Sequence, residues 1–219
     1  MHIIQKTLIK RLMLSPSLKF TELTNGYNAD DNVVFHLKKL TELGYIKKEE
    51  NLYLLTTDGV RKTNDYDWKS LVELGSKPLF VGFIAKYADK YLIKKHDHAK
   101  DQFYNLPNGK PYYDKEIRKE LVRIAKSEMN LETKEDDFAF DSVHIKHIVT
   151  SIGEVMFSDV FVVYSVQIFE IDELPSNIVL MKKGEVEKLR NKWKEIDFCI
   201  LREGWKPYLE YRFESNYIL

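Results

Sequence analysis

Residues 106–131 read LPNGKPYYDKEIRKELVRIAKSEMNL, and this stretch decides how the second half of the chain folds. It opens with the turn-forming residues Pro107, Asn108 and Gly109. A helix is predicted after these residues in the chain, over residues 115–129. This helix would carry a basic stripe, because its cationic residues are spaced four, four and three apart at Lys115, Lys119, Arg123 and Lys126.

Segments with strand character flank this helix. Apolar and β-branched residues predict strands over residues 79–85, 91–95, 143–149 and 160–169, with a turn at 88–90 between the first two. A further helix is expected over residues 185–195. Strands that alternate with helices predict an α/β or α+β sandwich for this half of the chain.

The stretch resembles the signature of the Nudix family. Tyr104 and the run from Leu106 to Lys110 resemble the Trp-x-Leu-Pro-Gly-Gly-Lys segment that leads into the Nudix box. With Gly109 as the first glycine of the box, Arg123 falls on the family's arginine without a gap, and Glu128 falls on its last glutamate. The resemblance covers roughly residues 77–200 and implies an α/β/α sandwich with a mixed sheet.

Most carboxylates of the Nudix box are replaced. Lys115, Ile124 and Ser127 stand where the family has glutamates, and Asn130 stands where it has its second glycine. Hydrolysis by Nudix enzymes needs several carboxylates that hold divalent cations next to the pyrophosphate. We therefore expect neither a metal site nor hydrolase activity. If the chain were a hydrolase, Glu128 would be its catalytic residue and Mg²⁺ or Mn²⁺ its cofactor.

The basic stripe suggests a different role for this helix. Together with Lys110 it could bind an anionic ligand directly, where the family would use metal. The candidate ligand-binding residues are then Tyr104, Lys110, Lys115, Lys119, Arg123 and Glu128. The alternative is a solvated face, with Arg123 in a structural role.

The first 63 residues have a different pattern. Helices are expected over residues 3–14, around Phe20 and Leu23, and from a cap at Asp30 to about Leu43. Two short apolar runs, 45–46 and 52–55, surround a polar tip and predict a hairpin.

Residues 32–46, NVVFHLKKLTELGYI, and 53–59, YLLTTDG, resemble the recognition helix and wing of ArsR- and MarR-type winged helix-turn-helix regulators. The resemblance implies DNA binding by the side chains that the apolar stripe leaves free. The candidates on the helix and wing are Asn32, His36, Lys38, Lys39, Lys47 and Lys48. Residues 1–64 hold ten basic and seven acidic side chains, a net charge of 10 − 7 = +3, so use of this unit for protein contacts or dimerisation remains an alternative.

The predicted organisation is a winged helix-turn-helix over residues 1–63, a connecting helix over 64–76 and a Nudix-like domain over 77–219 with an aromatic C-terminal extension. Trp68, Leu71 and Leu74 give the connector its helical spacing. The extension is expected to pack on the core or on a second subunit. Regulators that combine the two domains are known, with the Nudix part first, so the order here is reversed.

Three functions follow from this organisation. The first is a homodimeric transcription regulator that binds DNA and senses a phosphorylated or nucleotide metabolite. The second is a divergent hydrolase of nucleoside diphosphate derivatives, with a metal site built around Glu128 and acids from elsewhere, such as Glu116, Glu120, Glu132 or Glu154. The third is a protein-interaction module.

The remaining features limit the alternatives. Basic and acidic residues balance at 34 each, so any nucleic-acid surface must be local. The single cysteine, Cys199, favours a buried core thiol in a reducing, cytoplasmic setting, and no apolar run is long enough for a membrane span. His96 and His98 favour a solvated turn over a metal site, and His144 and His147 should point to opposite faces of a strand.

Overall fold

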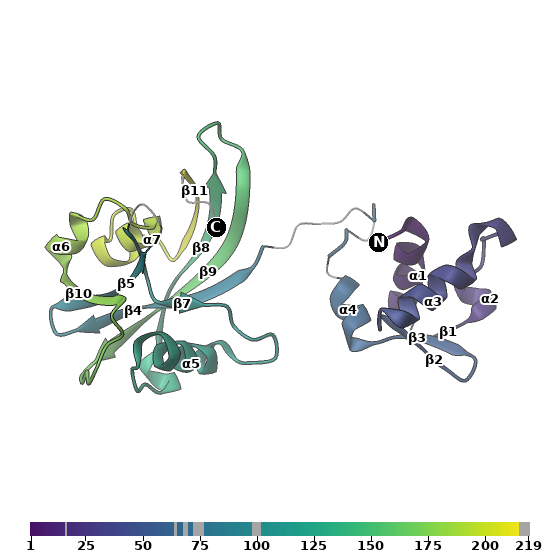
Figure 1. Ribbon diagram of the computed structural model, residues 1–219, viewed down its shortest axis with the longest axis horizontal. Helices are drawn as coiled ribbons and strands as arrows, with labels where there is room; N and C mark the ends of the chain where they lie inside the picture. Colours follow the sequence, from purple (N-terminus) through teal and green to yellow (C-terminus); the bar gives the residue numbers. More distant parts are fainter. Residues whose placement is uncertain (16, 64, 68–69, 72–76, 98–101, 215–219) are drawn as a thin grey trace. The chain divides into compact units, whose positions relative to one another are not determined.

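The computed structural model of the chain describes residues 1–15, 17–63, 65–67, 70–71, 77–97 and 102–214. The chain divides into two compact units, Met1–Ser76 and Lys77–Leu219. Each unit has its own core and is described by itself (Figure 1).

The described part of the N-terminal unit combines short helices with a three-stranded sheet of order β1-β3-β2. Leu8, Leu12, Leu37, Leu40 and Ile46 are buried together in its core. The first two helices and the hairpin lie where the sequence predicts them. The elements are α1 (Ile3–Met13), β1 (Leu18–Lys19), α2 (Phe20–Leu23), η1 (Ala29–Asp31), α3 (Val33–Glu42), β2 (Ile46–Glu49), β3 (Leu52–Leu55) and α4 (Thr57–Thr63).

Helix α3 begins later than expected, and Asp30 does not cap it. Asp30 lies in η1, and the carboxylate of Asp31 accepts a hydrogen bond from the backbone N–H of Asn28 at 2.7 Å. Asn32 takes the N-cap position with a φ of 49°, which interrupts the helical path between η1 and α3. The carboxylate of Asp31 is therefore used by the preceding turn.

The expected connecting helix does not form in the described part of residues 64–76. The carboxylate of Asp67 accepts a hydrogen bond from the backbone N–H of Ser70 at 2.8 Å, and Leu71 has a φ of 57°. An aspartate carboxylate that accepts from the N–H three residues on is typical of a turn or of a helix N-cap, and the described residues 65–67 and 70–71 are not helical. Residues 64, 68–69 and 72–76 lie outside the described residues, so Trp68 and Leu74 are not placed.

The C-terminal unit is built around a mixed eight-stranded sheet. The main order is β10-β5-β4-β9-β8-β11, with β6 paired to β5 and β7 to β4. The pairs β4–β9 and β8–β11 are parallel, and the other pairs are antiparallel. The strands are β4 (Leu79–Tyr87), β5 (Lys90–Asp97), β6 (Gln102–Asn105), β7 (Asn108–Gly109), β8 (Ala139–Val149), β9 (Val155–Ile168), β10 (Ile178–Lys182) and β11 (Tyr208–Glu214).

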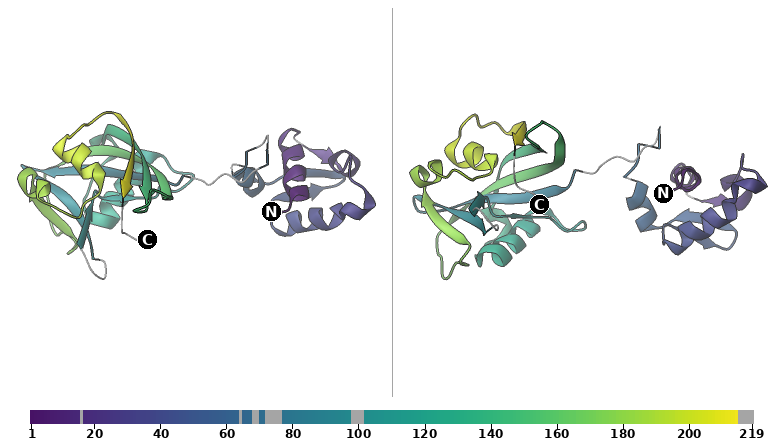
Figure 2. Two further views of the ribbon diagram at one scale, coloured as in Figure 1. Left: turned by 90° about the horizontal axis from the view of Figure 1, so that it is seen from above. Right: turned by 45° about the horizontal axis from the view of Figure 1, so that its top comes forward.

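Helical segments cover both faces of this sheet (Figures 1 and 2). Val81 and Phe83 of β4 face α5 and its Leu121, whereas Ile84 of β4 faces Ile196 on the other side. The alternation follows from the two-residue repeat of a strand. The helical segments are α5 (Ile117–Met129), η2 (Glu135–Asp137), α6 (Lys183–Glu187), α7 (Lys194–Ile196) and the π-helical turn η3 (Asp197–Leu201). The unit is an α+β fold with a mixed sheet.

One predicted helix, over residues 185–195, is wrong. It is split into α6 and α7, because the chain between them runs beside β6. The backbone N–H of Tyr104 donates to the carbonyl of Asn191 at 3.0 Å, and the N–H of Trp193 donates to the carbonyl of Tyr104 at 3.0 Å. These bonds use backbone groups that a continuous helix would need.

The aromatic extension forms β11, which the sequence did not predict as a strand. It pairs in parallel with β8 from Tyr208 opposite Val143 to Glu214 opposite Val149. Tyr211 packs edge-on against Phe198 at 5.0 Å between ring centroids. The extension therefore packs on its own unit. None of the described helices is long and apolar enough to cross a membrane.

Candidate functional site

The loop before α5 is tightly packed against the sheet. Gly82 of β4 pairs with Asn108 of β7, and a Cβ at Gly82 would lie 2.6 Å from the carbonyl oxygen of Pro107 and 2.6 Å from Phe161. A Cβ at Gly109 would lie 3.2 Å from the side chain of Ile124 on α5. The turn residues of the 106–110 segment are therefore needed for close packing.

Arg123, one of the candidate ligand-binding residues, is held by contacts within its own unit. Its guanidinium donates to the buried carboxylate of Glu120 at 2.7 and 2.9 Å and to the carbonyl of Lys110 at 3.1 Å. It also lies 4.6 Å from the ring centre of Tyr112, whose backbone N–H donates to Glu120 at 3.0 Å. These hydrogen bonds lower the pKa of Glu120 despite the opposing effect of burial, which is the largest single influence.

Glu128, the glutamate that the sequence resemblance singles out, is paired with a lysine. The ammonium of Lys94 on β5 donates to the carboxylate of Glu128, and the two side chains are only 15% and 33% exposed. Lys94 was not singled out from the sequence, because it lies on a strand 34 residues before Glu128. The pair places a positive charge next to the carboxylate of Glu128.

The other cations of the α5 stripe are also paired. Lys115 lies 3.2 Å from Asp114, and Lys119 lies 2.9 Å from Glu116. Lys126 contacts Glu132 and Asn130. These pairs lie at the surface, where ion pairs contribute little. Each cation of the stripe therefore has an acidic neighbour within this unit.

A cavity of about 290 Å³ opens near the start of the 106–110 loop. Lys110 is the one candidate ligand-binding residue that lines the cavity. The lining does not include the other candidates, which are Tyr104, Lys115, Lys119, Arg123 and Glu128. Four aromatic rings line it, together with amide and charged side chains from several strands. The lining residues are Phe80, His96, Asn105, Asn108, Lys110, Lys146, Ile148, Phe157, Asp159, Phe161, Trp193 and Glu195.

Three buried charges lie together in this cavity. The ammonium of Lys146 is 3.4 Å from Asp159 and 3.5 Å from Glu195, and it lies 4.8 and 4.9 Å from the ring centres of Phe161 and Trp193. Lys146 and Asp159 are cross-strand partners on β8 and β9. The cluster was missed in the sequence, although lone charges within apolar strand segments are a signal that could have found it.

Asp159 is the least satisfied member of the cluster. Its Oδ1 is buried and has no hydrogen-bond partner among the described residues. Burial raises the pKa of Asp159 from 3.8 to about 6, with Glu195 adding to the effect and Lys146 opposing it. A buried acceptor without a partner is costly unless a bound group satisfies it.

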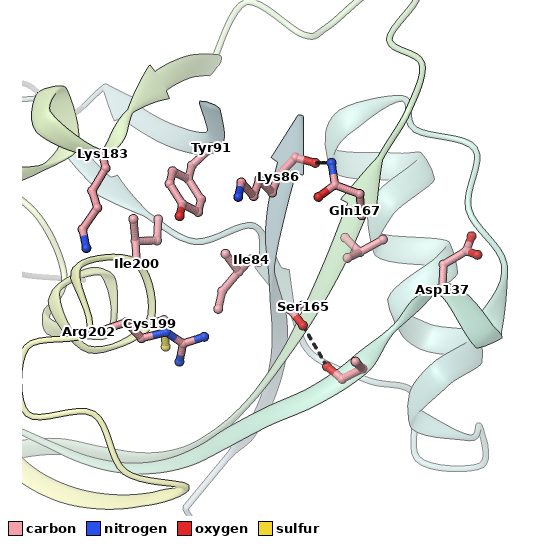
Figure 3. Close-up of a pocket in the computed structure, with 12 residues that line it drawn as sticks. Ile84, Lys86, Tyr91, Asp137, Ser165, Gln167, Lys183, Cys199, Ile200 and Arg202 are labelled. Atoms are coloured by element: carbon pink, nitrogen blue, oxygen red, sulfur yellow. Dashed lines mark hydrogen bonds between the residues drawn. The ribbon is translucent and has the colours of Figure 1, made fainter. Parts of the chain in front are cut away.

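A second, more open cavity of about 530 Å³ lies beside α6 and η3. Figure 3 shows Lys86, Lys183 and Arg202 among its labelled side chains. Arg202 is paired with Asp141 at 2.8 Å, and Lys86 and Lys183 are exposed. Among the described residues that line this cavity, none has a buried polar atom without a hydrogen-bond partner.

Cys199 is a buried core thiol. Its sulfur lies 3.8 Å from His144, and Ser142 lies 2.9 Å from the same imidazole nitrogen. Burial raises the pKa of Cys199 and lowers that of His144, so neither group is activated for nucleophilic chemistry. His144 is buried and His147 bonds Ser158 on the other side of β8, as the strand repeat predicts.

The histidines give no metal site in the part of the chain that the structure describes. His98 lies outside that part, and His96 bonds the side chain of Asn105 at 3.1 Å. The described residues contain no group of three or more histidines, cysteines or acids that could hold a metal ion.

In the N-terminal unit, five of the six candidate DNA-binding residues do not belong to the core. Lys38 and Lys39 are exposed on α3, Lys47 and Lys48 on β2, and Asn32 is exposed at the N-cap of α3. His36 is a correction, because it is buried and its ring stacks on His2 at 4.4 Å. The apolar residues Val34 and Phe35 are instead exposed.

Solved structures of Nudix proteins are similar to this chain. A MutT mutator protein from Bacillus halodurans has a TM-score of 0.48 at 15% identity, over 63% of this chain and 89% of its own. A Nudix hydrolase from Nitrosomonas europaea has a TM-score of 0.45 at 14% identity, over 67% and 85%. The Nudix domain of Shewanella oneidensis NrtR, solved with ADP ribose, has a TM-score of 0.46 at 13% identity, over 66% and 94%. No family of known proteins matches the chain by sequence, and no curated protein matches it significantly.

Proposed function

We propose that the protein is a ligand-responsive DNA-binding regulator. In this proposal the C-terminal unit is a Nudix-type domain that binds a phosphorylated or nucleotide metabolite without hydrolysing it. The N-terminal unit is a winged helix-turn-helix that binds DNA as part of a homodimer.

The ion pair between Lys94 and Glu128 carries this proposal. A metal-dependent hydrolase needs carboxylates that are free to coordinate a cation. Here Glu128 is already neutralised by an ammonium from β5, and the other glutamate positions of the box are Lys115, Ile124 and Ser127. The cavity of about 290 Å³ with aromatic and charged walls supports a binding role for this domain.

The exposed lysines of α3 and β2 support DNA binding. Lys38 and Lys39 lie on one turn of α3, and Lys47 and Lys48 lie on the hairpin. Phosphate contacts supply most of the affinity of such domains, and their number sets the salt dependence of binding. Glu42 and Glu49 partly offset these charges, at 3.5 Å from Lys39 and 2.6 Å from Lys47.

The test is fluorescence polarisation with DNA from the region upstream of the protein's own gene, at two salt concentrations. We expect sequence-dependent binding that weakens with salt. Lys38→Ala should weaken it and reduce the salt slope by about one, whereas Lys206→Ala, an exposed lysine of the other unit, should not. Binding that is absent or indifferent to sequence would contradict the regulator.

The hydrolysis question is tested separately. A panel of nucleoside diphosphate derivatives with Mg²⁺ or Mn²⁺ should give no turnover. Turnover that Glu128→Gln abolishes would instead favour the divergent hydrolase.

A second candidate for the N-terminal unit is a protein-contact surface. Val34 is 65% and Phe35 is 54% exposed on α3, next to a cavity of about 270 Å³ between α2 and α3. Exposed apolar groups of this kind mark contact surfaces. If Val34→Ser and Phe35→Ser change the oligomeric state and leave DNA affinity intact, this face serves protein contact.

A further inference from the structure

We infer that the cavity around Lys146, Asp159 and Glu195 binds a nucleotide through its base, with a ring N–H or amino group donating to Asp159 and the phosphate lying toward Lys110. This inference deepens the proposed function, on which it rests, by moving the ligand site from the α5 stripe to the cavity.

The walls of the cavity suit a flat ring. Phe80, Phe157, Phe161 and Trp193 all line it, and they come from β4, β9 and the segment before α7. Aromatic side chains stack on planar heterocycles irrespective of the exact pattern of ring nitrogens. The walls therefore select for planarity.

The buried charges select for a hydrogen-bond donor. Two carboxylates, Asp159 and Glu195, face one ammonium, Lys146, so the cluster has an excess of acceptors. Glu195 has a further donor in the hydroxyl of Tyr211 at 3.4 Å, but Oδ1 of Asp159 has none among the described residues. A bound N–H or amino group would satisfy that oxygen, whereas a ligand edge made only of acceptors would be repelled.

The rim of the cavity favours a negative group. Lys110 is exposed and its ammonium lies 5.4 Å from the ring centre of Phe80. Asn105 and Asn108 add amide groups. A donor-bearing edge inside and a cation at the rim match a base that carries a phosphate on its sugar.

The cavity volume limits the ligand. Sites for drug-sized ligands span about 300–1,000 Å³, and the cavity of about 290 Å³ lies at the lower end. A single nucleoside fits this size better than a whole dinucleotide.

The experiment is isothermal calorimetry with the full chain at pH 7.5. The probes are the 5′-monophosphates of adenosine, guanosine and cytidine, their nucleosides, and purine riboside 5′-monophosphate, whose base has no N–H or amino donor. We expect at least one donor-bearing nucleotide to bind roughly tenfold or more tightly than the donor-free probe, since a hydrogen bond to a charged group contributes about 1.5–3 kcal/mol.

Two variants locate the base and two locate the phosphate. Asp159→Asn and Phe80→Leu should each weaken binding roughly fivefold or more. Lys110→Ala should reduce the affinity for the nucleotide to that for the nucleoside. Lys119 belongs to the α5 stripe and is paired with Glu116, so Lys119→Ala should change neither the nucleotide affinity nor the nucleoside affinity. Circular dichroism verifies that each variant is folded, and Phe80→Leu keeps the test valid if Asp159→Asn does not fold.

The inference is overturned if no probe binds, if the donor-free probe binds equally well, or if Lys119→Ala weakens binding while Lys110→Ala does not. Its failure is distinct from that of the proposed function. If no nucleotide binds in the cavity while DNA binding is intact, only the inference about the cavity is contradicted. If a nucleotide binds but DNA does not, only the proposed role as a DNA-binding regulator is contradicted.

Discussion

At the scale of single residues, Lys94 and Glu128 can be tested for the strength of their pairing. The double-mutant cycle of Lys94→Met and Glu128→Gln should give a coupling of about 1 kcal/mol, because the glutamate is a third exposed and water screens the pair. The measurement is urea denaturation at neutral pH. A coupling of zero would mean that the lysine does not hold the carboxylate in solution.

Asp159 predicts a pH dependence of stability. Its pKa in the folded chain is about 6 against a usual 3.8, so the folded state holds the proton more tightly than the unfolded state between these values. The ionised Asp159 therefore lowers the unfolding free energy as the pH rises from about 4 to 6, and its effect is complete above that window.

Replacing Asp159 by Asn should remove this cost. The stability of Asp159→Asn relative to the natural chain should rise from pH 4 to pH 6.5, by at most about 3 kcal/mol. Denaturation curves across this range give the difference, in which the titrations of groups far from Asp159 cancel. A difference that is constant or falls with pH would show that the carboxyl is not shifted upward.

At the scale of elements, the two cations Arg123 and Lys119 on α5 should differ strongly. Arg123→Ala leaves the buried carboxylate of Glu120 without its main partner and should cost about 2–4 kcal/mol. Lys119→Ala breaks an exposed pair that water screens, so it should change the stability far less. Thermal unfolding of both variants makes the comparison, and equal effects would contradict the structural role of Arg123.

The contact between β4 and β7 depends on Gly82. A Cβ there would come within 2.6 Å of the Pro107 carbonyl oxygen, which belongs to backbone and cannot easily move. Gly82→Ala should therefore destabilise the C-terminal unit by about 2 kcal/mol or more. Gly184→Ala is the matched control, since a Cβ at that position meets nothing within 4 Å. Chemical denaturation measures both.

Some helices and strands could be predicted from the sequence and others could not. Helix α5 and strands β4, β5, β8 and β9 were predicted near their observed positions, because apolar repeats and turn residues mark them locally. The helix over residues 185–195 was wrong because bonds to Tyr104, 87 residues before Asn191, hold the chain between α6 and α7. Strand β11 was missed because its pairing with β8 is not local.

At the scale of the whole molecule, the two units should unfold separately. Gly59 is packed so tightly that a Cβ would lie within 1.9 Å of the carbonyl oxygen of Tyr45. Gly59→Ala should thus lower the melting temperature of the N-terminal unit alone. Calorimetry with two resolved transitions, of which one moves, is the expected result. A common shift of both transitions would mean that the units are energetically coupled.

The candidate site was harder to predict than the fold. The resemblance to the Nudix box implies that Lys115, Ile124 and Ser127 replace carboxylates, and this inference needs only the sequence. The sequence did not show whether the cations of α5 have partners. Only the folded geometry assigns these partners, which are Asp114, Glu116, Glu120 and Glu132. The cavity brings together residues from Phe80 to Glu195, and only the folded sheet makes them neighbours.

The parallel pair of β8 and β11 affects how the chain is made. Translation completes β8 at Val149 and reaches Tyr208, the start of β11, only 59 residues later (208 − 149). During that interval the nascent chain presents β8 with one row of backbone donors and acceptors unpaired, which is the kind of edge that recruits strands from other chains. The order of synthesis therefore leaves β8 as the edge of the sheet until the ribosome has delivered β11, which then takes the edge position.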